Sequence, residues 1–287
     1  MSKKVDLALA MLKHIAAPGW RANALVKLLL GCAALVKPRK KVAMKNFELI
    51  FPNATQEQKK LWLSQCYENL ALMSVEMLAW QDNPAVLNDF AVEVSGQKYF
   101  DEAFARGKGA LLMTAHYSNW EFLVAWTGYN YNFSGIAQHN KSAFQKELIN
   151  RLRTSAGTKI IGKEEPMLRA ISVLKNNAAL GLISDQHTGS EGILAPFFDI
   201  PCSTAQGLAV FAYLTKAPII PVRTLRLAPY KFKIEISPPI EWEKKATRDE
   251  TVYDIVCKTN HVIEAWIKDA PGEWLWLHKR YKDVVEY

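Results

Sequence analysis

A histidine and a glutamate stand five residues apart in the segment Thr114-Ala-His-Tyr-Ser-Asn-Trp-Glu121, which directly follows an apolar run. Histidine, with an ordinary pKa of about 6.5, is well suited to remove a proton from a hydroxyl nucleophile at neutral pH. A carboxylate that accepts a hydrogen bond from one ring nitrogen fixes the tautomer of the imidazole and stabilises the imidazolium that forms. His116 and Glu121 are therefore candidates for a general base and for the carboxylate that orients it.

This pairing places a condition on the local structure. Two side chains five residues apart on one continuous helix point about 140° apart, so His116 must lie outside the helix and Glu121 in its first turn. Ser118 is a suitable N-cap, which would place Glu121 at the third helical position. The same spacing has a purely structural explanation, because Ser118-x-x-Glu121 is a capping box in which the glutamate satisfies helix-end amides. Both interpretations stay open at this point.

Motifs for other chemistries are missing from the sequence. The four cysteines, Cys32, Cys66, Cys202 and Cys257, show no Cys-x-x-Cys spacing, which predicts reduced thiols in a cytosolic compartment. No glycine-rich loop followed by Lys-Ser or Lys-Thr is found, and no metal-ligand constellation. Gly-x-Ser-x-Gly is also absent, which disfavours a serine esterase of the α/β-hydrolase type. We therefore expect no metal and no resident cofactor.

The elements around the segment predict an α/β fold. The first third of the chain is mainly helical: one helix spans Arg39–Ile50, and a second begins after Thr55 as N-cap and runs to about Asp82. From Phe90 onward, short strands alternate with helices. The predicted strands are Phe90–Val94, the run before His116, Gly135–Gln138, Lys159–Ile161, Ala179–Ser184, Ile219–Leu227 and Phe232–Ser237. The predicted helices are Gln97–Ala105, Ser142–Ser155, Pro166–Asn176, Thr204–Leu214 and Asp249–Ile267.

Such alternation is typical of one α/β sheet covered by helices on both faces. The last two predicted strands form an antiparallel hairpin, so we expect a single mixed, mostly parallel sheet with a helical N-terminal region. The segment that contains His116 follows a strand of this sheet, which is where α/β sheets place their sites.

The positive charge is concentrated at the N-terminus. The chain carries a net charge of +8, whereas residues 1–45 alone carry +9, with Asp6 as their single acid. The longest charge-free run in this segment is Leu28–Val36, preceded by Lys27, and a spanning helix needs about 20 mostly apolar residues. We therefore predict a basic, apolar helix that lies in the interface of an anionic membrane. An ordinary amphipathic helix is the alternative, and the lack of a basic stripe elsewhere disfavours nucleic acid as a partner.

Several blocks of the sequence resemble one family in the same order. His116-Tyr-Ser-Asn-Trp-Glu121 resembles the His-x-x-x-x-Glu block of the bacterial lipid A late acyltransferases, which add secondary acyl chains and belong to the glycerolipid acyltransferase group. The similarity covers roughly residues 40–282. The other similar blocks are Asn46–Pro52, Leu148–Arg153, Gly157 with Ile160-Ile161, Asp185-Gln186, Pro196–Phe198 with Pro201 and Thr204, Ala217–Pro221, and Trp274–Lys282.

The resemblance implies an acyltransferase with a glycerolipid-acyltransferase-like fold. Its reaction would move a fatty acyl group from acyl carrier protein, or from acyl-coenzyme A, to a hydroxyl of a lipid A precursor or similar glycolipid. His116 would act as the base, oriented by Glu121, and the acceptor hydroxyl would attack the thioester directly. Backbone amides at the start of the following helix would hold the oxyanion. No cofactor is implied beyond the acyl donor.

The resemblance also assigns supporting residues. Arg153 matches the family's motif arginine and is expected to contact Glu121 or a substrate phosphate. Asp185 and Gln186 would support the site or bind the acceptor, and Asn119 would serve packing and orientation. The segment Trp274–Arg280 is either a phosphate or membrane-boundary patch or a buried tryptophan pair.

Two features depart from the family, and the acceptor stays open. The family's N-terminal membrane helix is reduced here to a stretch interrupted by Lys27, and the unfamiliar residues His187 and Glu191 follow Gln186. We expect a membrane-associating segment over 1–45 and an acyltransferase domain over 46–287, peripheral or monotopic on the cytoplasmic face of the inner membrane. A relative of the phosphatidylinositol mannoside acyltransferases would share the same transfer chemistry on another glycolipid or phospholipid acceptor. An inactive membrane-surface scaffold of the same fold is a further alternative.

Overall fold

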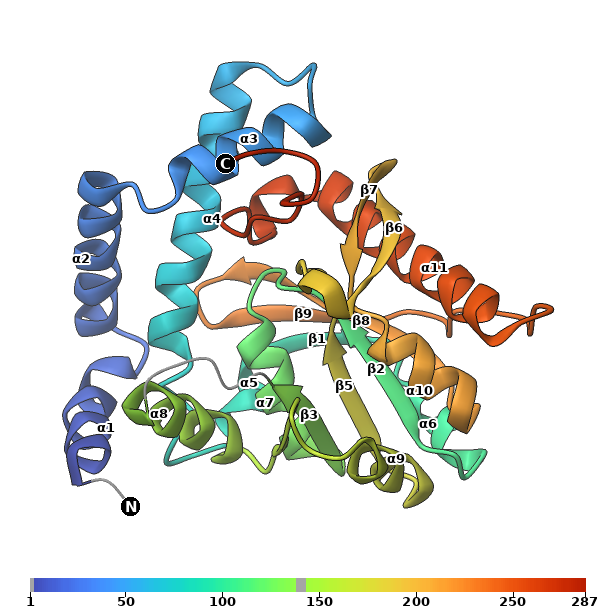
Figure 1. Cartoon of the computed structure of the whole chain (residues 1–287). Helices are drawn as coiled ribbons and strands as arrows, with labels where there is room; N and C mark the ends of the chain where they lie inside the picture. Colours follow the sequence, from blue (N-terminus) through green and yellow to red (C-terminus); the bar gives the residue numbers. More distant parts are fainter. Residues whose placement is uncertain (1–2, 138–142) are drawn as a thin grey trace.

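The computed structural model describes residues 3–137 and 143–287, and within them a seven-stranded sheet forms the centre of the molecule (Figure 1). The strands lie in the order β1-β9-β8-β2-β5-β3-β4. Only β8 and β9 pair antiparallel among these described neighbours, which confirms the mixed, mostly parallel sheet and its hairpin. The strands are β1 Ala91–Ser95, β2 Ala110–Thr114, β3 Phe133–Ala137, β4 Lys159–Gly162, β5 Ala179–Ile183, β8 Ile219–Ala228 and β9 Lys231–Ile236.

The central strand β2 is buried along its whole length because helices cover both faces of the sheet. Its side chains alternate between two apolar clusters, with Leu111 and Met113 in one and Ala110 and Leu112 in the other. The first cluster packs under α9 (Met167–Lys175), α10 (Gly207–Thr215) and α11 (Arg248–Asp269). The second packs under α6 (Lys98–Ala105) and α7 (Trp120–Asn130). This layered arrangement explains why the strands are continuous apolar runs rather than alternating ones.

Four helices precede the sheet: α1 Lys3–Ala16, α2 Trp20–Val36, α3 Lys40–Ile50 and α4 Gln56–Glu76. Thr55 caps α4 in a capping box with Gln58, which confirms the predicted start of that helix. The predicted end near Asp82 is wrong, because the backbone leaves the α-helix after Glu76 and continues in tight turns with three-residue spacing. In space, α2 packs on α4, and α1 packs on α8 (Ala143–Thr154).

Two strands and one short helix were not predicted. A two-stranded antiparallel hairpin, β6 (Ile193–Phe197) and β7 (Ile200–Thr204), precedes α10, so the helix predicted from Thr204 starts only at Gly207. The hairpin turns at Phe198 and Asp199, both at positive φ (53° and 60°), where glycine or asparagine is the usual signal. The short helix α5 (Val86–Phe90) also lacks a periodic pattern long enough to detect.

Gln138 and Ser142, predicted as a strand end and a helix start, lie outside the described residues. In the part of the chain that the structure describes, the helices are too short or too polar for any of them to span a bilayer.

Candidate active site

His116 lies directly after β2 and is held by a carboxylate from the neighbouring strand. Its Nδ1 lies 2.7 Å from Oδ1 of Asp185, and its backbone N–H donates to Oδ2 at 2.9 Å. Asp185 follows β5, which pairs parallel with β2, so the two carboxyl ends meet at one edge of the sheet. With Nδ1–H donated to Asp185, the lone pair of His116 is on Nε2 and available to accept a proton.

Asp185 is almost completely buried, and three N–H groups hold it. The indole Nε1 of Trp274 donates to Oδ2 at 2.7 Å, in addition to the two contacts from His116. Burial alone would raise the pKa of Asp185, but the interactions with His116 and the Trp274 hydrogen bond outweigh it and lower the pKa to about 2. Asp185 is therefore ionised at neutral pH.

Glu121 does not take the predicted place beside His116. It accepts two hydrogen bonds from Arg153, from Nε to Oε2 at 2.8 Å and from Nη2 to Oε1 at 2.5 Å, and a third from Nε1 of Trp120. Burial alone would raise the pKa of Glu121, but the guanidinium of Arg153 holds it below its ordinary value. The predicted hydrogen bond between Glu121 and His116 is thus corrected: Asp185 orients His116, and Glu121 binds Arg153.

The start of α7 explains this rearrangement. Asn119, and not Ser118, is the N-cap, and its side chain accepts the N–H of Phe122 at 2.8 Å. Glu121 is then the second residue of the helix, and the predicted Ser118–Glu121 capping box does not form. Ser118 instead adopts a positive φ of 49°, a costly conformation for a serine that turns the chain between His116 and the helix.

A cavity of about 780 Å³ opens at His116. Arg153 and Gln186 also line it, whereas Asp185 and Glu121 lie behind the residues that they bind. Its walls are mainly apolar and come from β2, β3, β5 and the helices on both faces of the sheet. The apolar wall residues include Leu112, Val124, Phe133, Ile149, Leu182, Leu208 and Phe211. Such a space suits a long apolar ligand whose reactive end reaches His116.

Two glycines shape this cavity. Gly135 of β3 and Gly181 of β5 both line it. A Cβ at Gly181 would lie only 2.5 Å from the Phe133 ring, so the ring can occupy its position only because residue 181 has no side chain. A Cβ at Gly135 would meet only the Phe133 ring at 3.8 Å and would otherwise project into open space.

Comparison with known families identifies the family of this chain. Residues 7–283 match the family described as bacterial lipid A biosynthesis acyltransferase. The chain belongs to that family. It is an acyltransferase, as the resemblance implied.

Individual relatives are distant in sequence. The lipid A biosynthesis palmitoleoyltransferase of Escherichia coli K12 is 26% identical over 253 residues, covering 86% of this chain and 80% of the relative. The lauroyltransferase of the same organism is 23% identical over 88% of this chain and 81% of its own length. The phosphatidylinositol mannoside acyltransferase of Mycobacterium tuberculosis H37Rv is 27% identical over 45% of this chain and 42% of its own length. The crystal structure of the 1-acyl-sn-glycerophosphate acyltransferase PlsC from Thermotoga maritima aligns over 88% of this chain and 97% of that chain, with a TM-score of 0.41 and 14% identity.

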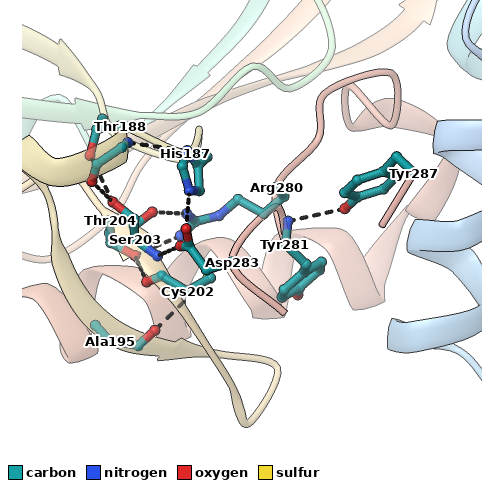
Figure 2. Close-up of polar contacts among 11 residues, drawn as sticks. His187, Thr188, Ala195, Cys202, Ser203, Thr204, Arg280, Tyr281, Asp283 and Tyr287 are labelled. Carbon is teal, nitrogen blue, oxygen red and sulfur yellow. Dashed lines mark hydrogen bonds and ion pairs between the residues drawn. The ribbon is translucent and has the colours of Figure 1, made fainter. Parts of the chain in front are cut away.

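The C-terminal segment of the acyltransferase is part of the site and not a surface patch. Trp274 and Trp276 are buried, which confirms the buried tryptophan pair. Arg280 is fully buried as well, and it donates to the carbonyl oxygen of Ser203 at 2.5 Å and to Oγ1 of Thr204 at 2.7 Å (Figure 2). The predicted phosphate or membrane-boundary role of Arg280 is therefore wrong, because its guanidinium is buried against β7 and does not reach the surface.

The two residues that depart from the family lie on the loop after β5, at the rim of the cavity. The Nε2 of His187 lies 2.8 Å from Oδ1 of Asp283, whose Oδ2 accepts the N–H of Ser203 at 3.0 Å (Figure 2). Glu191 forms an ion pair with Lys163. Both ring nitrogens of His187 are occupied, since Gly189 donates to Nδ1, so this imidazole fastens the loop to the C-terminal segment.

Proposed function

We propose that this acyltransferase moves a fatty acyl chain from a thioester donor, acyl carrier protein or coenzyme A, to a hydroxyl of a lipid A precursor or a similar glycolipid. One observation carries the proposal: the His116–Asp185 pair stands at the polar end of a 780 Å³ apolar cavity. The base faces the space in which an acyl chain fits, so the thioester carbon is delivered to the group that activates the nucleophile.

The reaction follows from this geometry. Nε2 of His116 takes the proton of the acceptor hydroxyl while the oxygen attacks the thioester carbonyl carbon. Asp185 stabilises the imidazolium that forms, because its buried carboxylate already binds Nδ1–H. The tetrahedral intermediate then collapses, the carbon–sulfur bond breaks, and the thiolate leaves with the proton from Nε2. The products are the new ester and the free thiol, and the enzyme needs no nucleophile of its own.

We assign Glu121 and Arg153 a supporting role in this reaction. Their ion pair joins α7 to α8, and Arg153 lines the cavity. Within the described residues, Nη1 of Arg153 has no hydrogen-bond partner, whereas Nε and Nη2 are held by Glu121. Glu121 thus orients the guanidinium, and Nη1 is the donor available to a polar group of the substrate.

Residues 1–45 are proposed to hold the enzyme on the cytoplasmic face of the inner membrane. They form α1, α2 and the first half of α3, and they expose large apolar side chains next to Arg21, Lys27 and other cations. The exposed apolar residues are Leu7, Met11, Trp20, Leu28, Leu35 and Val36. Apolar insertion and attraction to anionic headgroups would then act together.

The contacts of α1 support a cavity mouth near the membrane. Val5 and Leu9 of α1 pack against Leu148 and Leu152 of α8, and Asp6 pairs with Arg151. The same helix α8 contributes Arg153 to the cavity wall. A lipid acceptor could therefore keep its acyl chains in the bilayer while its hydroxyl reaches His116.

A direct assay tests the proposal. Purified protein is incubated with acyl-acyl carrier protein or acyl-coenzyme A and a lipid A precursor, and the products are read by mass spectrometry. We expect the acceptor to gain the mass of one acyl chain and His116→Ala to form no product. Transfer only to a phosphatidylinositol mannoside would instead support a second acceptor class. The mycobacterial phosphatidylinositol mannoside acyltransferase, which is similar to part of this chain, is the reason to include that acceptor in the assay. Thioester hydrolysis without transfer to any glycolipid would refute both.

A further inference from the structure

Glu76 is a buried carboxylate that the proposed reaction does not use. It ends α4, its side chain is 0% exposed, and both of its oxygens are occupied. Oε1 forms an ion pair with Arg226 of β8 and accepts the N–H of Tyr230 at 2.9 Å. Oε2 accepts a hydrogen bond from Nδ2 of Asn119 at 2.7 Å. Glu76 therefore joins α4, the β8–β9 hairpin and the N-cap of α7.

A buried ion pair of this kind is poor evidence for stability alone. Desolvation of a carboxylate and a guanidinium costs about as much as their attraction returns, and apolar residues of similar volume often do as well. What the polar network adds is a defined geometry, because a donor in the wrong place would leave a buried group unsatisfied. The network therefore fixes the positions of the groups that Glu76 binds.

The contacts lead from Glu76 to the imidazole of His116. Asn119 uses its Oδ1 to cap α7 and its Nδ2 to reach Glu76, so its amide orientation is determined from both sides. Trp120, the first residue of α7, packs its ring edge-to-face against His116, with centroids 5.0 Å apart and an interplanar angle of 73°. The chain between them passes through the strained Ser118, which would relax if the cap were lost.

We infer that Glu76 is a positioning residue, which acts through Asn119 to set the start of α7 and hence the orientation of His116. This inference rests on the proposed function, since it concerns the base of that reaction. It also connects α4, the helix on which α2 packs, to the catalytic segment.

An exchange of side chains tests the inference. Glu76→Gln alone leaves one acceptor oxygen where two are used, so its NH₂ group faces a donor in either orientation: Asn119, or Arg226 and the N–H of Tyr230. Asn119→Asp alone places two carboxylates together. In the double variant, the new carboxylate at position 119 accepts a hydrogen bond from the new NH₂ group at position 76 and still caps α7. The amide oxygen at position 76 remains as an acceptor for Arg226 and the N–H of Tyr230. We expect each single substitution to lower kcat at least tenfold with KM within twofold of wild type. The double variant is expected to recover kcat to within about threefold of wild type.

Matched controls separate positioning from stability. Glu264→Gln changes another buried helical glutamate, which accepts the N–H of Phe198 at 2.8 Å, and it should lower the thermal midpoint without changing kcat. If both single variants fail to fold, Asn119→Ser decides the matter, because serine still caps α7 but does not reach Glu76. It should lower kcat at least fivefold while the protein stays folded.

The proposed function and the positioning role of Glu76 fail in different ways. A wild-type protein without acyl transfer refutes the proposed function and says nothing for Glu76. An active wild type whose single variants keep full kcat, or whose double variant stays as impaired as the singles, overturns the positioning role. Full kcat in Asn119→Ser does the same.

Discussion

At the scale of single residues, two buried carboxylates serve different partners. Asp185 receives three N–H donors, two of them from His116, whereas Glu121 receives a bidentate contact from Arg153. A guanidinium matches a carboxylate in two parallel hydrogen bonds, so both oxygens of Glu121 are directed toward Arg153, and neither is hydrogen-bonded to His116. The base and its orienting group therefore come from different blocks of the sequence.

We predict that Asp185→Asn lowers kcat by about 10²–10⁴-fold, because the amide does not stabilise the imidazolium and can select the wrong tautomer. The measurement is steady-state transfer, with circular dichroism to show that the variant is folded. Activity above a tenth of wild type in a folded variant would show that Asp185 does not orient the base.

Asp185 also predicts an acid-dependent loss of stability. Its pKa falls from the ordinary value of 3.8 to about 2, so its stabilising contribution is fully present above about pH 4 and is lost as the pH falls toward 2. Its size is about 2 kcal/mol. Denaturant unfolding from pH 5 to pH 2 should show wild type losing more free energy of unfolding than Asp185→Asn. Parallel curves for the two proteins would contradict the assignment.

The Glu121–Arg153 pair predicts non-additive substitutions. Glu121→Ala leaves the half-buried guanidinium of Arg153 without its partner and should cost about 1–3 kcal/mol of stability as well as activity. In the double variant with Arg153→Ala, the coupling energy should be about 1–3 kcal/mol in the stabilising direction, measured by denaturant unfolding. Strictly additive losses would mean that the two side chains do not depend on each other.

At the scale of elements, β3 and β5 determine how much chain the cavity accepts. Gly135→Leu should fill part of the space, because a Cβ there projects into the open cavity with ordinary backbone geometry. We expect transfer of long acyl chains to fall at least tenfold relative to chains shorter by several carbons. Donors of graded length in competition provide the measurement, and Gly135→Ala is the matched control with a small effect. An equal loss for every chain length would place the acyl chain elsewhere.

At the scale of the whole molecule, charge and apolar surface are segregated at the N-terminus. Residues 1–45 carry a net charge of +9 and the whole chain carries +8, so residues 46–287 together carry −1. We predict that removal of residues 1–36, or Gln in place of Lys37, Arg39, Lys40 and Lys41, releases the protein from anionic vesicles in sedimentation. Moderate salt should weaken wild-type binding only partly, because it screens the charges and leaves the apolar contribution. Equally tight binding by the truncated protein would place the anchor in another part of the chain.

Local patterns in the sequence were sufficient for most of the element types and for the choice of His116 as the candidate base. Apolar runs, the Thr55 cap and the hairpin between β8 and β9 are determined by residues near one another in the chain. His116 could be identified because a polar cluster after a buried strand is a local feature. The charge of the N-terminal segment is likewise a property of the sequence alone.

The partners of those residues were decided by tertiary structure. His116 and Asp185 are 69 residues apart, and they meet because β2 and β5 pair parallel with their carboxyl ends level. The hydrogen bond from Trp274 and the burial of Arg280 likewise depend on where the C-terminal segment returns to the sheet. Sequence spacing suggested Glu121 because it is near His116 in the chain, but a shift of the cap from Ser118 to Asn119 turned it toward Arg153. Local patterns report which face or end a residue occupies, whereas the order of strands in the sheet decides which side chains it meets.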